Sequence, residues 1–193
     1  ILIGIYIILG ISLQLAIGYT GLLNLGHIAF YAIGAYTSAL LTLAGWPFLF
    51  SFISAGVMAM IFGFLLAGPT NKLKGDYLAL ATLGFSFVVY AVALNWTGLT
   101  RGPLGLPGIP SPSIFGINIS GNFSYFILVL IVTALSCFVI KRIISSPFGR
   151  TLQATRDNEL ATRTLGKNTL KIKTYSLGIS AFFAGIAGSL YAH

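Results

Sequence analysis

The chain has 193 residues, of which 56% are hydrophobic and only 7% are charged. In soluble domains about a quarter of the residues are charged. This composition therefore excludes an ordinary soluble fold and predicts an all-α, polytopic membrane protein. The net charge of +8 does not predict binding to nucleic acid, because the cations are not spread over a segment that could form a soluble domain. The single cysteine, Cys137, excludes a disulfide within the chain.

Four stretches carry no charged side chain, and they are 1–71, 77–100, 102–140 and 174–193. Each reaches the length of about 20 residues that crosses a bilayer, and the first is long enough to cross three times. The sequence therefore predicts a bundle of about six transmembrane helices. The chain does not begin with Met and both of its ends lie in apolar runs, so we expect a fragment of a longer protein, incomplete at both ends.

The first predicted span, 1–17, is followed by an interruption at 18–27. This stretch holds Gly18, Gly21 and Gly26 together with Asn24 and His27. Backbone that leaves the helix at membrane depth must be buried in protein or line water, so we expect a broken or re-entrant segment there. Asn24 and His27 are candidates for the translocation path. The alternative is that His27 only satisfies backbone carbonyls freed at the break.

The remaining predicted elements follow in order. They are a span at 28–44 ended by Gly45-Trp46-Pro47, a span at 48–68 stopped by Pro69, a wet loop at 70–76, a span at 77–96, a Pro-rich loop without helix at 97–122, a span at 123–140, a basic loop at 141–173 and a span at 174–193. The Pro-rich loop either only connects two spans or meets a soluble delivery protein outside.

The basic loop 141–173 holds ten of the fourteen charged residues. Asp157 and Asn158 can cap a helix start, and Gly166 stands where a left-handed residue ends a helix. These signals predict a short helix at about 158–165. Leu160, Ala161, Thr164 and Leu165 share one of its faces. A helix of roughly 12 Å is too short to be stable by itself and needs to pack against another surface. This indicates an element that docks on a partner. The alternative is a solvated loop.

Sidedness follows from the cations. If 141–173 is cytoplasmic, alternation of the spans puts 70–76 and the break at 18–27 on the same side, and 45–47 and 97–122 outside. Ten of the eleven Lys and Arg residues then lie inside, as the positive-inside rule requires.

Several kinds of chemistry are missing from the sequence. No carboxylate falls within a predicted span, which weighs against an ion-coupled carrier. The two histidines, His27 and His193, form no metalloprotease spacing, so a membrane enzyme is disfavoured. No phosphate-binding Gly-rich loop with a following Lys is present, so we expect any ATP to be hydrolysed by another chain, with no cofactor in this one.

Three stretches carry recognisable motifs. The first is 18–36, with Leu25-Gly26-His27 and Gly34-Ala35-Tyr36. The second is Lys74-Gly75-Asp76-Tyr77-Leu78-Ala79-Leu80-Ala81-Thr82-Leu83 with the loop Gly102 to Pro112. The third is Ser146-Pro147-Phe148-Gly149-Arg150 through Arg156-Asp157-Asn158-Glu159-Leu160-Ala161 to Gly166, with Ser180-Ala181 and Ala184-Gly185 to Gly188. Together these stretches resemble the LivM-like permeases of branched-chain amino acid ABC transporters. Asn24 departs from the family pattern, which more often has Ser.

This resemblance implies a single permease transmembrane domain, 1–193, in the bacterial inner membrane, moving hydrophobic amino acids inward. The implied partners are a second, LivH-like permease, two cytoplasmic ATPases, a periplasmic amino-acid-binding protein and membrane lipid. Alternatives are uptake of urea, short amides or another small solute, and an ion-coupled secondary transporter. The implied ATPase-coupling residues are Arg150, Arg156, Asp157, Asn158, Glu159, Leu160, Ala161, Leu165 and Gly166, and the path candidates are Asn24, His27 and Tyr77.

Overall fold

The computed structural model describes residues 1–70, 73, 75–114, 117–118 and 121–193. Within these residues the helices are α1 (Leu2–Gln14), α2 (His27–Leu43), α3 (Phe48–Thr70), α4 (Asp76–Asn95), α5 (Thr97–Thr100), α6 (Asn122–Ser145), α7 (Pro147–Asp157), α8 (Glu159–Thr164) and α9 (Thr169–Ala192). A π-helical turn, η1 (Leu15–Tyr19), continues α1, and a 3-10 turn, η2 (Gly102–Leu104), follows α5. Two short antiparallel strands, β1 (Ser113–Ile114) and β2 (Ile117–Asn118), complete the described elements.

The predicted class of a polytopic helical membrane protein is confirmed. Over the described residues, five helical segments are long and apolar enough to cross a membrane: Leu2–Tyr19, α3, α4, α6 and α9. Helix α2 is a shorter apolar helix of 17 residues. Together these make the six apolar helices that the uncharged runs predict.

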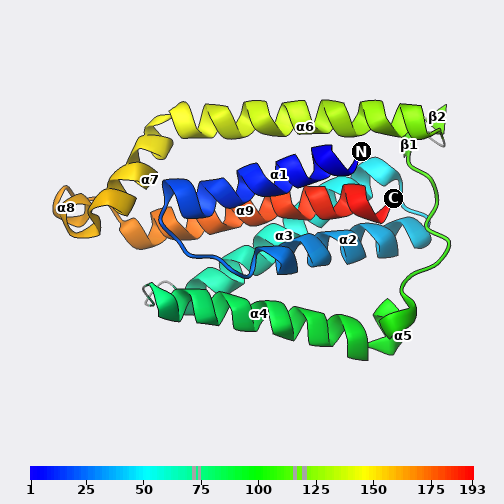
Figure 1. Cartoon of the computed structure of the whole chain (residues 1–193), viewed down its shortest axis with the longest axis horizontal. Coiled ribbons are helices and arrows are strands. Elements are labelled where there is room, and N and C mark those ends of the chain that lie inside the picture. Colours follow the sequence, from blue (N-terminus) through cyan, green and yellow to red (C-terminus); the bar gives the residue numbers. More distant parts are fainter. Residues whose placement is uncertain (71–72, 74, 115–116, 119–120) are drawn as a thin grey trace.

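Helix α9 forms the centre of the bundle. In Figure 1 it runs between α1, α2 and α3, with α4 and α6 on the outer sides. Buried residues make up 72% of its apolar stretch, against 11% for α4. Its small residues permit this position, because a Cβ at Gly188 would collide with the Tyr31 carbonyl, and one at Gly34 of α2 would collide with Gly185. Helices α2 and α9 therefore pack backbone against backbone.

Two apolar clusters fill the space around α9. One joins α1, α3, α6 and α9, and its buried members include Ile5, Ile8, Phe48, Val129, Phe183 and Leu190. The other joins α2, α3 and α9, through Phe30, Leu66, Leu177 and Ala184 among others. These contacts fix the positions of the helices that flank the break and of those that connect to α7 and α8.

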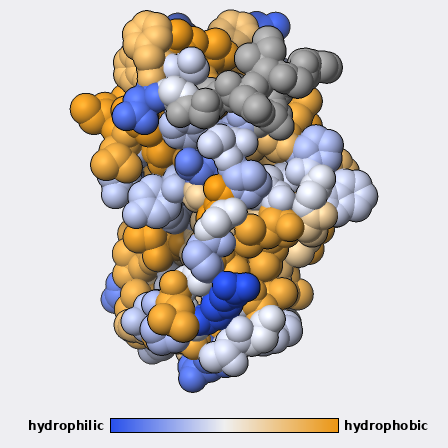
Figure 2. Space-filling model, turned by 90° about the vertical axis from the view of Figure 1, so that its right-hand side faces the viewer, coloured by the Kyte–Doolittle hydropathy of each residue, from blue (hydrophilic) through white to orange (hydrophobic). Residues whose placement is uncertain are grey.

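The connections separate into two ends, as alternation predicts. Figure 1 places α7, α8, the break after η1 and the start of α4 at one end, and the α2–α3 connection, α5 and the short strands at the other. Figure 2 looks onto the latter end, where polar and weakly polar residues run down the middle between hydrophobic flanks. Lys72 and Lys74, which the sidedness argument also used, lie outside the described residues.

Three predicted boundaries were wrong. Pro69 lies inside the last turn of α3, where it removes only one backbone hydrogen bond, and the helix continues to Thr70. The segment 97–122 does contain a short helix, α5, because the Thr100 hydroxyl donates to the Ala93 carbonyl and ties the turn to α4. The basic segment 141–173 is mostly helical rather than one loop, since α6 extends to Ser145 and α9 begins at Thr169.

Candidate functional site

Helix α7 begins the polar end of the molecule. Ser146 caps it by accepting a hydrogen bond from the Gly149 amide (3.3 Å), and Pro147 takes the first helical position. Leu152 and Thr155 are buried on the inner face at a spacing of three. A Cβ at Gly149 would collide with the Ile144 carbonyl, so only glycine permits α7 to turn this tightly off the end of α6.

Helix α8 lies where the cap residues predict a helix, although it is shorter by one residue at each end. The Asn158 side chain accepts a hydrogen bond from the Ala161 amide (3.0 Å). At the other end Gly166 has φ +76°, its amide donates to the Arg163 carbonyl (2.9 Å), and the Lys167 amide donates to Thr162 (3.3 Å). This pair of bonds is a Schellman motif. Both ends of α8 are therefore fixed by local chemistry.

The outer face of α8 is apolar and uncovered in this chain. Leu160 is 71% exposed and Leu165 is 80% exposed, and Ala161 and Thr164 are exposed beside them. The opposite face is buried at Thr162. A short helix that presents leucines outward and is held from behind has the form of a docking surface. We call the exposed residues Leu160, Ala161, Thr164 and Leu165 the α8 face.

Glu159 points back into the molecule rather than outward. Its Oε2 accepts a hydrogen bond from Lys173 Nζ (2.8 Å), and its Oε1 accepts from Arg163 Nη2 (2.7 Å) and Thr169 Oγ1 (3.1 Å). Burial of the carboxyl group is the largest single influence and raises its pKa, but the hydrogen bonds and charges of these three partners outweigh it and hold the pKa of Glu159 below its ordinary value.

The predicted break is present between η1 and α2. Helix α1 widens into the π-helical turn, and Gly21 then adopts φ +72°, a conformation that favours glycine. Arg156 of α7 donates from Nη1 to the Gly18 carbonyl at the end of this turn. The Thr20 hydroxyl hydrogen-bonds the hydroxyl of Ser176 on α9 (2.5 Å). The segment 18–27, called the break below, is thus held by two other elements at its first half.

The second half of the break is held by α4. The Leu25 amide donates to Thr82 Oγ1 (3.0 Å), and the Gly26 amide donates to Oδ1 of Asn24 (3.0 Å). A Cβ at Gly26 would collide with the Thr82 carbonyl. Glycine is therefore required where the break passes α4, and protein groups satisfy its freed amides, as backbone at membrane depth needs.

His27 is buried and bonded to a side chain rather than to a carbonyl freed at the break. Its Nε2 lies 2.8 Å from the hydroxyl of Ser12, which itself donates to the Leu9 carbonyl (2.8 Å). The tautomer of His27 decides which of the two groups donates in this bond. Nδ1 is buried and has no hydrogen-bond partner among the described residues.

Asn24 lines a small enclosed cavity of about 10 Å³, which is about the space that one water requires. The other lining residues are Leu22, Thr70, Leu78, Thr82, Lys173 and Leu177. The Nδ2 of Asn24 is buried and lacks a hydrogen-bond partner in the part of the chain that is described. Tyr77 does not join this lining, since α4 contributes Leu78 and Thr82 while Tyr77 is 74% exposed.

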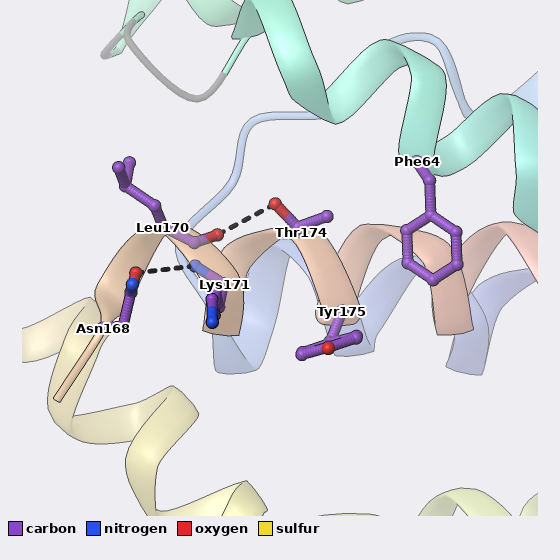
Figure 3. A pocket seen from close by; sticks show the side chains of 6 residues that line it. All are labelled: Phe64, Asn168, Leu170, Lys171, Thr174 and Tyr175. Atoms are coloured by element: carbon purple, nitrogen blue, oxygen red, sulfur yellow. Dashed lines mark hydrogen bonds between the residues drawn. The ribbon is translucent and has the colours of Figure 1, made fainter.

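A larger open groove of about 530 Å³ lies where α9 begins. Figure 3 shows the Phe64 ring of α3 and the Tyr175 ring of α9 near each other, with Lys171 one turn before Tyr175. The two rings are 6.2 Å apart and nearly perpendicular. Tyrosine and lysine side chains collect at the level where hydrocarbon gives way to water. These side chains are typical of a membrane boundary, and the groove lies at the end of the molecule that carries α8.

The structure brings some predicted residues together and separates others. Arg156, Glu159 and Asn158 make the contacts given above, whereas Arg150 and Asp157 are exposed on α7. Three residues that contact the predicted ones were not predicted as part of the site. Ser12 bonds to His27, Thr82 to the Leu25 amide, and Lys173 to Glu159. Thr82 lies in a stretch that resembles the family, but nothing local indicates its contact with Leu25, 57 residues away. For Lys173 the sequence offers no local signal, because its partner lies 14 residues away.

Taken together, the apolar helices around a buried central helix define a multi-span helical membrane protein. The sequence profile of the family described as "Branched-chain amino acid transport system / permease component" matches residues 1–193. This chain belongs to that family.

Three relatives illustrate the range of similarity. The "High-affinity branched-chain amino acid transport system permease protein LivM" of Escherichia coli K12 is 43% identical over 97% of this chain and 50% of its own length. The probable branched-chain amino acid transport permease LivM of Methanocaldococcus jannaschii is 28% identical, over 98% of this chain and 64% of its own. The guanosine ABC transporter permease NupQ of Bacillus subtilis is 24% identical, over 90% and 59%. The chain thus spans about half the length of the Escherichia coli protein, and no solved structure matches it.

Proposed function

We propose that this chain is the membrane-spanning core of a permease subunit in an ATP-binding-cassette importer of branched-chain amino acids, acting in the bacterial inner membrane. The observation that carries the proposal is the 43% identity to the Escherichia coli LivM permease over 97% of the chain. The permease moves its substrate without altering it chemically. ATP is hydrolysed by a separate chain, and this chain needs no cofactor of its own.

The α8 face is the proposed contact with a cytoplasmic ATPase. Two observations support this: its leucines are exposed while both ends of α8 are capped, and it lies at the end of the molecule where most of the cations gather. The further partners are a second permease subunit, a second ATPase and a periplasmic amino-acid-binding protein. Closure of the ATPase pair on ATP pushes α8 and tilts the spans, so that access alternates between the two sides.

The break is the proposed wall of the translocation path. Asn24 and His27 each bury a polar nitrogen without a partner among the described residues. Such a nitrogen costs about 1–3 kcal/mol unless something binds it. The cavity beside Asn24 has room for about one water, so a polar group of a solute reaches this nitrogen only when movement of the break opens the cavity. Tyr77 is a third candidate, at the exposed start of α4. Apolar substitutes of similar size, Asn24→Leu and His27→Leu, test these roles, and normal uptake at normal expression rejects them.

A second candidate keeps the same class and changes the substrate. One relative is named for guanosine, and it shares 24% identity over 90% of this chain. Urea, short amides and other small solutes stay alternatives of the same kind, because no side chain in the spans reveals a substrate. The higher identity to the branched-chain amino acid permease favours leucine, isoleucine and valine.

Uptake of labelled leucine by cells that express the full-length permease with its partner subunits tests the function. We expect isoleucine and valine to compete, urea and guanosine not to compete, and uptake to stop when the ATPase carries an inactive phosphate-binding loop. Uptake that survives loss of the ATPase but stops with an ionophore supports an ion-coupled carrier and contradicts the proposal. If guanosine or urea competes and isoleucine and valine do not, the substrate is a solute of the alternative class.

A further inference from the structure

The strongest polar attachment of α8 is to α9. Glu159 accepts hydrogen bonds from Lys173 Nζ and Thr169 Oγ1, both on α9. From its own helix it accepts one from Arg163. The side chains of Lys173 and Glu159 are 11% and 17% exposed. A pair this enclosed resists separation, because each charge would lose its partner without gaining full solvation. Helix α8 therefore cannot swing away from α9 freely.

Lys173 also faces the break. It lines the enclosed cavity together with Asn24 of the break and Thr82 of α4. Thr82 in turn accepts the hydrogen bond from the Leu25 amide. One lysine thus lies between the carboxylate of α8 and the residues that hold the second half of the break.

A second connection joins α7 to the first half of the break. Arg156 donates to the Gly18 carbonyl, and its Cγ packs 3.1 Å from the position that a Cβ of Gly21 would take. The unit formed by α7 and α8 is therefore attached to both halves of the break. Arg156 contacts the first half directly, and Glu159 is connected to the second half through Lys173 of α9.

We propose that Glu159, Lys173 and Arg156 are positioning residues that make α9 and the break follow any displacement of α8. This inference rests on the proposed function, because it assumes that a partner moves the α8 face. It assigns to these residues a role inside the chain, whereas the contact with the partner belongs to the exposed leucines. Loss of the ion pair between Glu159 and Lys173 should leave the ATPase bound, but its ATP hydrolysis should no longer be coupled to transport.

The test uses the complete transporter reconstituted in liposomes with its binding protein, and measures ATP hydrolysed per leucine transported. We expect Glu159→Gln and Lys173→Met each to keep the ATPase bound while raising this ratio at least about fivefold, the range of coupling between two sites. The double variant should be no worse than either single one, because the same interaction is lost once. Lys171→Gln is the matched control, an exposed lysine one half-turn away that forms no ion pair within the described residues.

A wild-type ratio in both single variants, or additive effects in the double one, overturns the inference. Absence of ATP-driven leucine uptake in the unaltered complex overturns the proposed function instead. Hydrogen exchange on the unaltered complex gives a second measurement that needs no variant. ATP should change protection at 159–164 and 169–174 together, and a change in α8 without one at the start of α9 contradicts the inference.

Discussion

The hydroxyl of Ser12 on α1 and Nε2 of His27 at the start of α2 lie 2.8 Å apart, across the break. This bond joins the two helices that the break interrupts. Ser180 of α9 adds to it, because its hydroxyl donates to the Ser12 carbonyl (2.6 Å). The interruption is thus a defined structure, held to the central helix, rather than a slack connection.

Loss of the Ser12 hydroxyl should destabilise the protein. In Ser12→Ala the buried Nε2 of His27 loses its partner, which costs about 1–3 kcal/mol, so we expect a lower midpoint of thermal unfolding in detergent. Ser54→Ala is the control, because within the described residues the Ser54 hydroxyl bonds only to carbonyls of its own helix, those of Phe50 and Ser51. Equal midpoints for the two variants would show that the bond across the break carries no stability.

Close packing of α2 and α9 should make Gly188 intolerant of a side chain. A Cβ there collides with the Tyr31 carbonyl, so Gly188→Ala forces the helices apart and should cost about 1–3 kcal/mol or more. At Gly84 of α4 a Cβ meets nothing within 4 Å. There alanine should be neutral or stabilising by up to about 1 kcal/mol. Folded yield and thermal unfolding measure both, and similar yields would refute the packing argument.

The α8 face should decide how much ATPase co-purifies with the permease. Burial of one leucine contributes about 1.5–3 kcal/mol, so Leu160→Ser should weaken association about tenfold or more. Leu104→Ser is a suitable control, because Leu104 is 90% exposed and lies in η2, which follows α5 at the opposite end of the molecule from α8. If Leu104→Ser weakens association as much as Leu160→Ser does, the face of contact is misassigned.

Removal of the Asn158 cap should loosen α8 locally. Asn158→Ala leaves the Ala161 amide without its acceptor, at a cost of about 0.5–2 kcal/mol. Hydrogen exchange at 159–164 should then become faster while α9 keeps its protection. Asn158→Ser, which restores a capping oxygen, should return most of the protection, and failure of serine to do so would mean that the side chain acts in another way.

Acid should release α8 from α9. The pKa of Glu159 is lower in the folded protein than its ordinary value of 4.5, so its attachment is fully present above about that pH and is lost as the pH falls through the lowered pKa. After correction for intrinsic exchange, protection of α8 should be constant from neutral pH down to that value and should fall below it. In Glu159→Gln this pH dependence should disappear, and its persistence would assign it to another group.

The parts of the fold that local chemistry decides could be predicted. Charge-free runs predicted the six apolar helices, and clustered glycines predicted the break. Asn158 and Gly166 predicted α8, because a helix cap is a contact between residues three or four positions apart. The alternation of the loops predicted which connections share an end, as Figure 1 shows.

The parts that depend on distant partners could not be predicted. Glu159 lies in a highly charged stretch, where nothing indicates that its carboxylate turns inward to a lysine 14 residues away. Thr82 belongs to a stretch that resembles the family, but nothing in that stretch indicates that the fold places it beside Leu25. Helix α7 was overlooked because its buried face consists of only three residues, Gly149, Leu152 and Thr155, although Ser146 and Pro147 are typical of a helix start.

Sidedness of the α8 face tests the central claim most directly, because a cytoplasmic ATPase can dock only on the inside. A single thiol at this face, Leu160→Cys in a full-length background with Cys137→Ser and any further cysteine replaced, is treated with a membrane-impermeant maleimide. We predict no labelling in intact cells and full labelling in inverted membrane vesicles. Labelling from the outside of intact cells would contradict the account.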